Sequence, residues 1–318
     1  GDRRMDGERR LYRYRTFGQD AALFILDARS FRDNQLSSPN LADQVDVFRF
    51  LSESYAPGRT LLGEAQLAAL QRDLLRAKEQ GITWKFIALP QPIQNLGIGG
   101  ADDRYEGYAA ERAMLLAFIR EHDIRNVVFI AADIHGTLVN DLAYQTEFGL
   151  SGPQIMTGAW EITVGSVAAA GMIGPTIVAK AEQLGLLSAE EVALYERLPV
   201  ANDTDSQLDD KDDFVKANLN QLLALFGYPE IGLTGGAVDA RLRSGDYLST
   251  HTFGWTEFDI LPDSQRLRVT TYGIASYNAA DLATNPDEIL SRAPEIVSQF
   301  IVLPNAEISG VFLPIVAR

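Results

Sequence analysis

Blocks of apolar residues alternate with polar blocks along the first 140 positions of the chain. Apolar runs at 21–26, 84–89 (with Lys85 inside it) and 127–132 predict three strands, and the last run, apolar on both faces, is typical of an interior strand that is covered on both sides of a sheet. Between these runs, leucines at helical spacing predict a helix over 63–80, and a second apolar stripe predicts a helix over 109–121. Strands that alternate with helices indicate a layered α/β domain.

The pattern becomes less regular in the second half. It predicts a strand at 160–164, helices at 188–198 and 213–226, and a β-hairpin formed by 252–260 and 266–272. The helix at 188–198 opens with Ser188 and Glu191 at the spacing of a capping box. Prolines and polar residues mark 34–60 as a long surface excursion, and the last segment of the chain shows no clear pattern.

Composition narrows the class of protein. The chain has 318 residues, 46% of them hydrophobic, which is enough for a substantial core in one or two domains. With 28 basic and 43 acidic residues the net charge is −15, which argues against a broad nucleic-acid-binding or membrane-binding surface. The absence of cysteine excludes disulfides and thiolate ligands within this chain. No apolar run reaches transmembrane length, and residues 1–10 lack the apolar core of a signal peptide.

Two side chains that commonly bind metals follow the strand at 127–132. Asp133 and His135 stand two positions apart, so an extended backbone would point both the same way. Ligands of open α/β sheets collect at the carboxyl ends of the strands, and a carboxylate with an imidazole suits iron, zinc or manganese. The competing interpretation is that Asp133 caps the next helix and that the pair arises by chance.

Arginines follow the strand at 21–26. Arg29 and Arg32 carry planar guanidinium groups that match pairs of phosphate oxygens, so Arg29 is a candidate substrate-binding residue. Ion pairs with Asp27 or Asp33 are equally compatible with the sequence.

The acidic run at 202–213 does not fit a calcium loop of the EF-hand type. Counted from Asp203, the sixth position is Leu208, where that loop requires glycine. We therefore interpret the run as a solvated loop whose acids complement the dipole of the following helix. His122, at the end of a predicted helix, is interpreted as structural, and His251 as either close to a site or exposed.

Taken in order, several segments resemble the PhoD-type alkaline phosphatase/phosphodiesterase family. They are Tyr12-Arg-Tyr-Arg-Thr-Phe-Gly18, Leu26-Asp-Ala-Arg-Ser-Phe-Arg-Asp33, Leu62-Gly-Glu-Ala-Gln66, Trp84-Lys85, Asp103-Arg-Tyr-Glu-Gly-Tyr108 with Arg112, and Ala132-Asp-Ile-His135. The resemblance covers about residues 11–140 and, more loosely, the later hairpin. It implies a two-sheet α/β sandwich flanked by helices, of the metallophosphoesterase kind.

The resemblance also implies a function. Asp133 and His135 would help to bind a centre of Fe³⁺ and Ca²⁺, although another divalent metal would suit the same side chains. The substrate would be a small phosphate monoester or diester, some relatives act as D-type phospholipases, and the location would be periplasmic or secreted. The competing hypothesis is a non-catalytic protein that keeps the fold to bind a ligand or partner.

Three departures from the family pattern matter. Ala132 replaces the usual glycine and Tyr105 the usual tryptophan, which indicates a divergent branch. Nothing before Tyr12 matches the family's amino-terminal half, which supplies further metal ligands. We therefore expect residues 1–318 to be the carboxyl-terminal portion of one metallophosphoesterase domain. The missing ligands would be cleaved off, lie on a companion chain or be left out.

Overall fold

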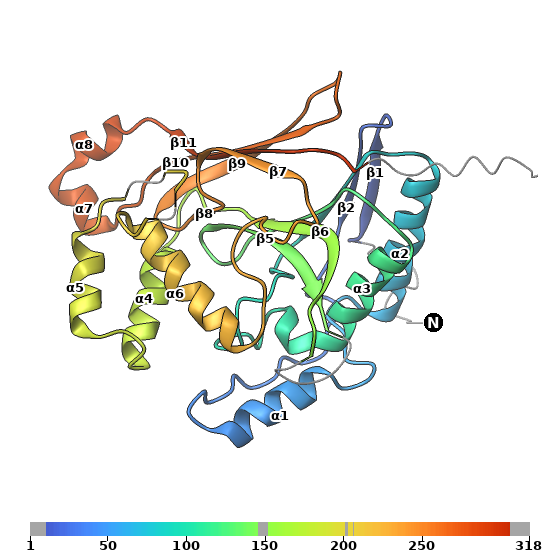
Figure 1. Cartoon of the computed structure of the whole chain (residues 1–318), viewed down its shortest axis with the longest axis horizontal. Coiled ribbons are helices and arrows are strands. Elements are labelled where there is room, and N and C mark those ends of the chain that lie inside the picture. The colour runs from blue at the N-terminus through green and yellow to red at the C-terminus, as the bar shows by residue number, and fades with distance from the viewer. Residues whose placement is uncertain (1–10, 146–151, 201–202, 206, 306–318) are drawn as a thin grey trace, which may run out of the picture.

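Two β-sheets that pack face to face form the centre of the molecule (Figure 1). This arrangement is seen in a computed structural model, which describes residues 11–145, 152–200, 203–205 and 207–305. The larger sheet has seven strands in the order β1-β2-β3-β4-β6-β5-β8. Their bounds are β1 (Arg13–Phe17), β2 (Ala21–Ile25), β3 (Trp84–Leu89), β4 (Val127–Ala131), β5 (Thr137–Tyr144), β6 (Ile155–Thr163) and β8 (Leu248–Ser249).

The direction of these strands brings several strand ends to one edge of the sheet. Strands β2, β3, β4 and β6 run parallel to one another, whereas β1, β5 and β8 pair antiparallel to their neighbours. The three apolar runs predicted as strands are β2, β3 and β4, and β4, predicted to be covered on both faces, is buried in all but one of its residues. The carboxyl ends of the parallel strands therefore open on one common edge.

The smaller sheet is fully antiparallel. Its order is β7-β11-β10-β9, with β7 (Ala240–Gly245), β9 (Thr252–Ile260), β10 (Leu267–Ala275) and β11 (Glu295–Val302). The predicted hairpin is confirmed as β9 and β10. Trp160 of the larger sheet meets Phe300 of the smaller one edge to face, with ring centroids 5.7 Å apart, in the apolar layer between the sheets.

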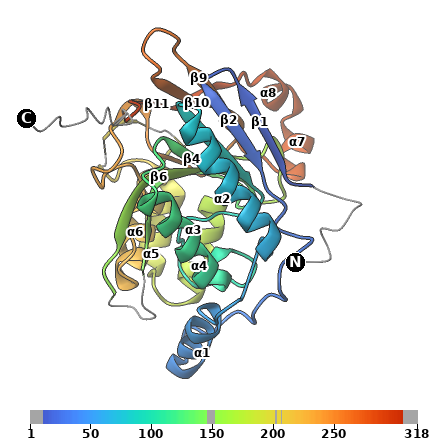
Figure 2. The same ribbon diagram turned by 90° about the vertical axis from the view of Figure 1, so that its right-hand side faces the viewer.

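Helices cover the rest of the structure. On the outer face of the larger sheet lie α2 (Glu64–Glu79) and α3 (Ala109–Glu121), which face the viewer in Figure 2. At the opposite end in Figure 1 lie α4 (Ile173–Gln183), α5 (Ala189–Arg197) and α6 (Lys211–Leu225). The remaining helices are α1 (Gln44–Ser54), the 3₁₀ turn η2 (Tyr105–Tyr108), α7 (Ala279–Thr284) and α8 (Pro286–Ser291).

The α/β class with two sheets and flanking helices agrees with the expectation from sequence. The segment 34–60 was predicted as a surface excursion without a helix of its own, and the structure adds α1 within it. Apolar residues occupy both faces of α1: Phe50 is fully buried, while Val45 and Phe48 are exposed. Because apolar residues lie on both faces, the sequence of α1 does not show the apolar stripe that predicts a helix. Within the described part of the chain, no helix has the length and apolar character needed to cross a membrane.

Candidate metal centre

The side chains predicted to bind metal and substrate leave neighbouring strands at the common edge. Asp27 to Arg29 follow β2, Gln91 follows β3, and Asp133 to His135 follow β4. These three strands are adjacent in the sheet. Because neighbouring strands lie about 4.8 Å apart, the ends of β2 and β4 are separated by about 10 Å.

The turn that carries Asp133 and His135 is not extended, as the sequence argument assumed. Asp133 has φ = 78° and His135 has φ = 55°, in the left-handed region that side chains other than glycine adopt at a cost. Both side chains are exposed, while Ile134 between them packs on the apolar cluster formed by α4, α5 and α6. Backbone strain of this kind concentrates at functional sites, so the turn is a candidate site.

A hydrogen bond selects the tautomer of the neutral His135 ring. Its Nδ1 lies 2.9 Å from the carbonyl oxygen of Gly171. Because a carbonyl only accepts, Nδ1 must carry the proton, and a neutral ring then presents the lone pair of Nε2. Histidines that ligate metals are commonly oriented by such a bond from the other ring nitrogen. The carboxylate of Asp133 and this imidazole therefore fit a transition metal in their donor chemistry.

Close packing fixes the turn against the beginning of α4. A Cβ on Gly136 would lie 2.3 Å from Cγ2 of Ile173, so glycine is required there. The backbone N–H of Ile173 donates to the carbonyl of His135 at 3.2 Å. One residue further along α4, a Cβ on Gly174 would lie 2.5 Å from Oγ1 of Thr250 and 2.6 Å from the ring of His251. The turn therefore packs against the first residues of α4, and these residues pack against His251.

His251 is buried and fully hydrogen bonded. Its Nε2 lies 2.8 Å from the hydroxyl of Tyr195, and its Nδ1 lies 2.8 Å from Oδ1 of Asp212. Burial raises the pKa of the Tyr195 phenol, so the hydroxyl keeps its proton and donates to Nε2. Nδ1 then carries the proton that Asp212 accepts. Of the two alternatives left open for His251, exposure is excluded.

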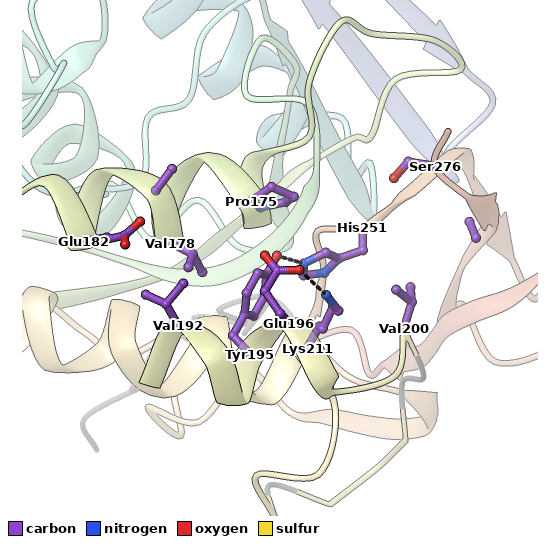
Figure 3. A pocket seen from close by; sticks show the side chains of 12 residues that line it. Pro175, Val178, Glu182, Val192, Tyr195, Glu196, Val200, Lys211, His251 and Ser276 are labelled. Carbon is purple, nitrogen blue, oxygen red and sulfur yellow. Dashed lines mark hydrogen bonds and ion pairs between the residues drawn. The ribbon is translucent and has the colours of Figure 1, made fainter. Parts of the chain in front are cut away.

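This network borders a pocket of about 290 Å³ between α4, α5 and the start of α6. Figure 3 shows Tyr195 and His251 joined by their hydrogen bond, and Lys211 beside Glu196. The Lys211 ammonium stands 4.3 Å from the centre of the Tyr195 ring. Sequence analysis missed Tyr195 and Asp212, because neither stands in a motif.

Arg29 is bound to groups other than those considered from sequence. Its Nη1 donates to both carboxylate oxygens of Asp103 at 2.8 Å, and Arg32 also contacts Asp103. With the Gln91 amide turned so that its oxygen faces the guanidinium, it accepts from Arg29 at 3.0–3.2 Å. Asp27 instead accepts from the backbone N–H of Arg29 at 2.9 Å.

The charge balance of this cluster favours an ionised Asp103. Partial burial alone would raise the pKa of Asp103, but the guanidinium groups of Arg29 and Arg32 outweigh it and lower that pKa. Two arginines thus share the one carboxylate of Asp103. Nearly half of the Arg29 side chain remains exposed.

Glu161 fixes the loop that carries Gln91. It lies on β6, which is separated from β3 by β4 in the sheet, and its carboxylate accepts from the backbone N–H groups of Ile93 at 2.8 Å and Gln94 at 2.9 Å. Complete burial raises the pKa of Glu161 to about 7, against the lowering effect of these two donors.

The interpretation of the acidic run as a solvated loop is partly wrong. Asp210, Asp212 and Asp213 are buried, because the first turn of α6 packs against the β8–β9 corner. One oxygen from each of Asp209, Asp210 and Asp213 lies within 4.8 Å of the others. Among the described residues, this is the one such group of three potential ligands, and neither Asp133 nor His135 belongs to a group of that size.

Comparisons with known proteins found a matching family model, a similar sequence and a similar fold. A family model described as PhoD-like phosphatase matches residues 2–216, which include the strand-end turn. Alkaline phosphatase D of Bacillus subtilis (strain 168) is 30% identical over 141 residues, which make up 42% of this chain and 22% of that protein. A solved structure described as "Structure of PhoD" matches with a TM-score of 0.53 and 19% identity.

The structural match covers 95% of this chain and 45% of the solved chain. The chain therefore spans about a fifth of the length of the Bacillus relative and less than half of the solved structure. The likeness in structure extends the match in fold across both sheets, and the family model covers more than half of the sequence. The chain belongs to the PhoD-like phosphatase family.

Proposed function

We propose that this chain forms the carboxyl-terminal portion of a metal-dependent phosphoesterase that hydrolyses phosphate monoesters or diesters. The observation that carries the proposal is the His135 ring, whose Nδ1 is occupied by Gly171 and whose Nε2 has no partner among the described residues. Together with the exposed carboxylate of Asp133, it offers two ligands on a strained turn within the segment matched by the family.

Asp133 and His135 would bind the metal, and iron fits this mixed donor pair better than calcium does. When bound, such a metal would supply positive charge that polarises the phosphoryl group. Other ligands would come from the part of the domain that this chain does not span. Iron together with calcium, and a periplasmic or secreted location, belong to the same proposal, which the family resemblance supports.

The Arg29–Arg32–Asp103 cluster would position the substrate. A phosphate that approaches the edge can take up the exposed side of the Arg29 guanidinium while Asp103 and Gln91 hold its plane fixed. A fixed fork of donors orients the ester without covalent participation. We expect Arg29→Ala to raise KM about tenfold with a smaller change in kcat, and unchanged kinetics would remove Arg29 from the site.

The direct test is metal binding and turnover of the protein that holds this chain together with the rest of the domain, as wild type and as His135→Ala. We expect iron in the purified protein and hydrolysis of p-nitrophenyl phosphate or bis-p-nitrophenyl phosphate. Loss of the His135 ligand should lower kcat/KM by two orders of magnitude or more. His122→Ala, which removes an exposed histidine at the end of α3, is the matched control. It should leave the iron content and kcat/KM unchanged.

The shortage of ligands favours one alternative. In the described residues, Asp133 and His135 belong to no group of three potential ligands, so a weak metal site without turnover would fit a binding protein. Iron bound through His135 with no hydrolysis of either ester, in the presence of added iron and calcium, would support that alternative over the enzyme.

A further inference from the structure

Three carboxylates gather where the acidic loop enters α6. One oxygen from each of Asp209, Asp210 and Asp213 lies within 4.8 Å of the other two. Asp209 is exposed, whereas Asp210 is 2% and Asp213 7% exposed. A cluster of like charges with two buried members requires a physical explanation.

Helix capping explains only one of these carboxylates. Oδ1 of Asp210 accepts from the backbone N–H of Asp213 at 2.9 Å, which is the ordinary bond of an N-cap residue. The carboxylate of Asp213 is not used in this way. Its Oδ2 is buried without a hydrogen-bond partner in the described structure, and no bond is found for its Oδ1.

Nearby protein charges do not compensate the cluster. Burial raises the pKa of Asp213 to about 7, and the charges of Asp210, Asp246 and Asp203 add to that effect. The Lys216 ammonium acts in the opposite direction, but it is bound to Asp246 at 2.6 Å. A buried carboxylate among acids, with no donor of its own, is stabilised either by a proton or by a cation.

We propose that Asp209, Asp210 and Asp213 bind a hard divalent cation of the size of calcium. Calcium takes oxygen ligands at about 2.4 Å, so oxygens on one ion lie up to about 4.8 Å apart, and the three oxygens of this cluster all lie within that distance of one another. Waters would complete the six to eight ligands that calcium takes. The donor set differs from that of Asp133 and His135, because it contains no imidazole.

The consequence of binding is local order in the first turn of α6. Asp212, between two of the proposed ligands, accepts from the backbone N–H of Thr250 at 3.0 Å and from His251. A cation that fixes this turn also fixes the position of His251, on which α4 rests. The site is therefore structural and independent of the proposed phosphoesterase activity.

Calcium titration of the chelator-treated full chain tests the proposal. We expect saturable uptake of one calcium at these residues, with a dissociation constant on the order of 10⁻⁴ M. Calcium at about 100 times that value should raise the melting temperature by several degrees. The same uptake should persist when Asp133 and His135 are both replaced by alanine, which separates this site from the proposed metal centre.

Substitutions separate the cation site from a capping role. Asp209→Asn and Asp213→Asn should each weaken calcium binding at least tenfold, whereas Asp287→Asn, at the exposed first turn of α8, should not. Without calcium, Asp213→Asn should melt higher than the wild type, because a buried unpaired charge is lost. Equal calcium binding in wild type and both cluster variants would overturn the proposal, as would an equal response to magnesium.

Discussion

The edge turn after β4 and the first turn of α6 both gather groups suited to metals, yet they are built in opposite ways. At the edge, Asp133 and His135 are exposed and sit on strained left-handed backbone. In α6 the backbone is regular, and Asp210 and Asp213 are buried with poorly compensated charge. The cost of the first region is conformational, and the cost of the second is electrostatic.

This difference predicts different responses to mutation. Removing a side chain at the edge relieves strain and disturbs little packing, so function should change more than stability does. In the first turn of α6, a carboxylate that accepts hydrogen bonds stabilises the fold, whereas a buried carboxylate without a donor destabilises it. Substitutions there should therefore change the free energy of unfolding strongly, and hydrogen bonding sets the direction of the change.

The largest effect on stability should come from Asp212→Ala. Three donors then lose their acceptor: the backbone N–H and hydroxyl of Thr250 and the Nδ1–H of His251. Breaking such a buried network costs about 3–5 kcal/mol in the free energy of unfolding, measurable by urea denaturation.

Asp287→Ala is the control for that measurement. Asp287 stands second in α8, as Asp212 stands second in α6, but it is exposed. Its loss should cost less than about 0.5 kcal/mol. Equal costs for the two variants would show that Asp212 acts only through the helix dipole.

Asp141 provides a buried carboxylate without the acidic neighbours of Asp213. Its Oδ2 accepts from the backbone N–H of Gly235 at 2.8 Å, Oδ1 is buried without a partner, and burial raises its pKa from 3.8 to about 6. The folded state therefore binds a proton more tightly than the unfolded state does. Stability from this group is complete below pH 3.8 and is lost as pH rises through 6, by about 3 kcal/mol at most.

Urea denaturation between pH 4 and 7.5 checks this dependence. Asp141→Asn should flatten the decline of stability over that range, whereas Asp259→Asn, at an exposed position of β9, should leave it unchanged. Calcium should not alter the Asp141 contribution, because Asp141 belongs to no cluster of potential ligands in the described residues. A parallel decline in wild type and Asp141→Asn would assign the pH dependence to another group.

The sequence predicts the elements whose local pattern agrees with their final environment. The run that became β4 is apolar on both faces, and all but one of its residues are buried. The capping box of Ser188 and Glu191 forms as its spacing indicates. By contrast, β11 was not predicted, because its burial depends on insertion between β7 and β10, which are distant in sequence.

In the candidate sites, too, the sequence predicts what a local pattern shows and misses contacts between distant segments. Asp133 and His135 could be singled out because they directly follow a recognisable strand. The partner of Arg29 could not be predicted, since Asp103 lies 74 positions away and reaches Arg29 only through the loop after β3. Likewise, the network of Tyr195, Asp212 and His251 joins three segments that no local pattern relates.

The smallest expected effect on stability is that of Asp133→Gly, which tests the turn after β4. No hydrogen bond of the Asp133 side chain is found, so the substitution removes none, and glycine adopts φ = 78° without the strain that aspartate carries. We expect the metal-free protein to gain up to about 1 kcal/mol in the free energy of unfolding, since the relief of strain exceeds the entropy that glycine adds to the unfolded chain. The same variant should bind iron more weakly. Asp263→Gly, at an exposed turn position without positive φ, should instead lose stability. If Asp133→Gly also loses stability, contacts of the aspartate side chain stabilise the turn, and the positive φ of Asp133 does not carry the cost that we infer.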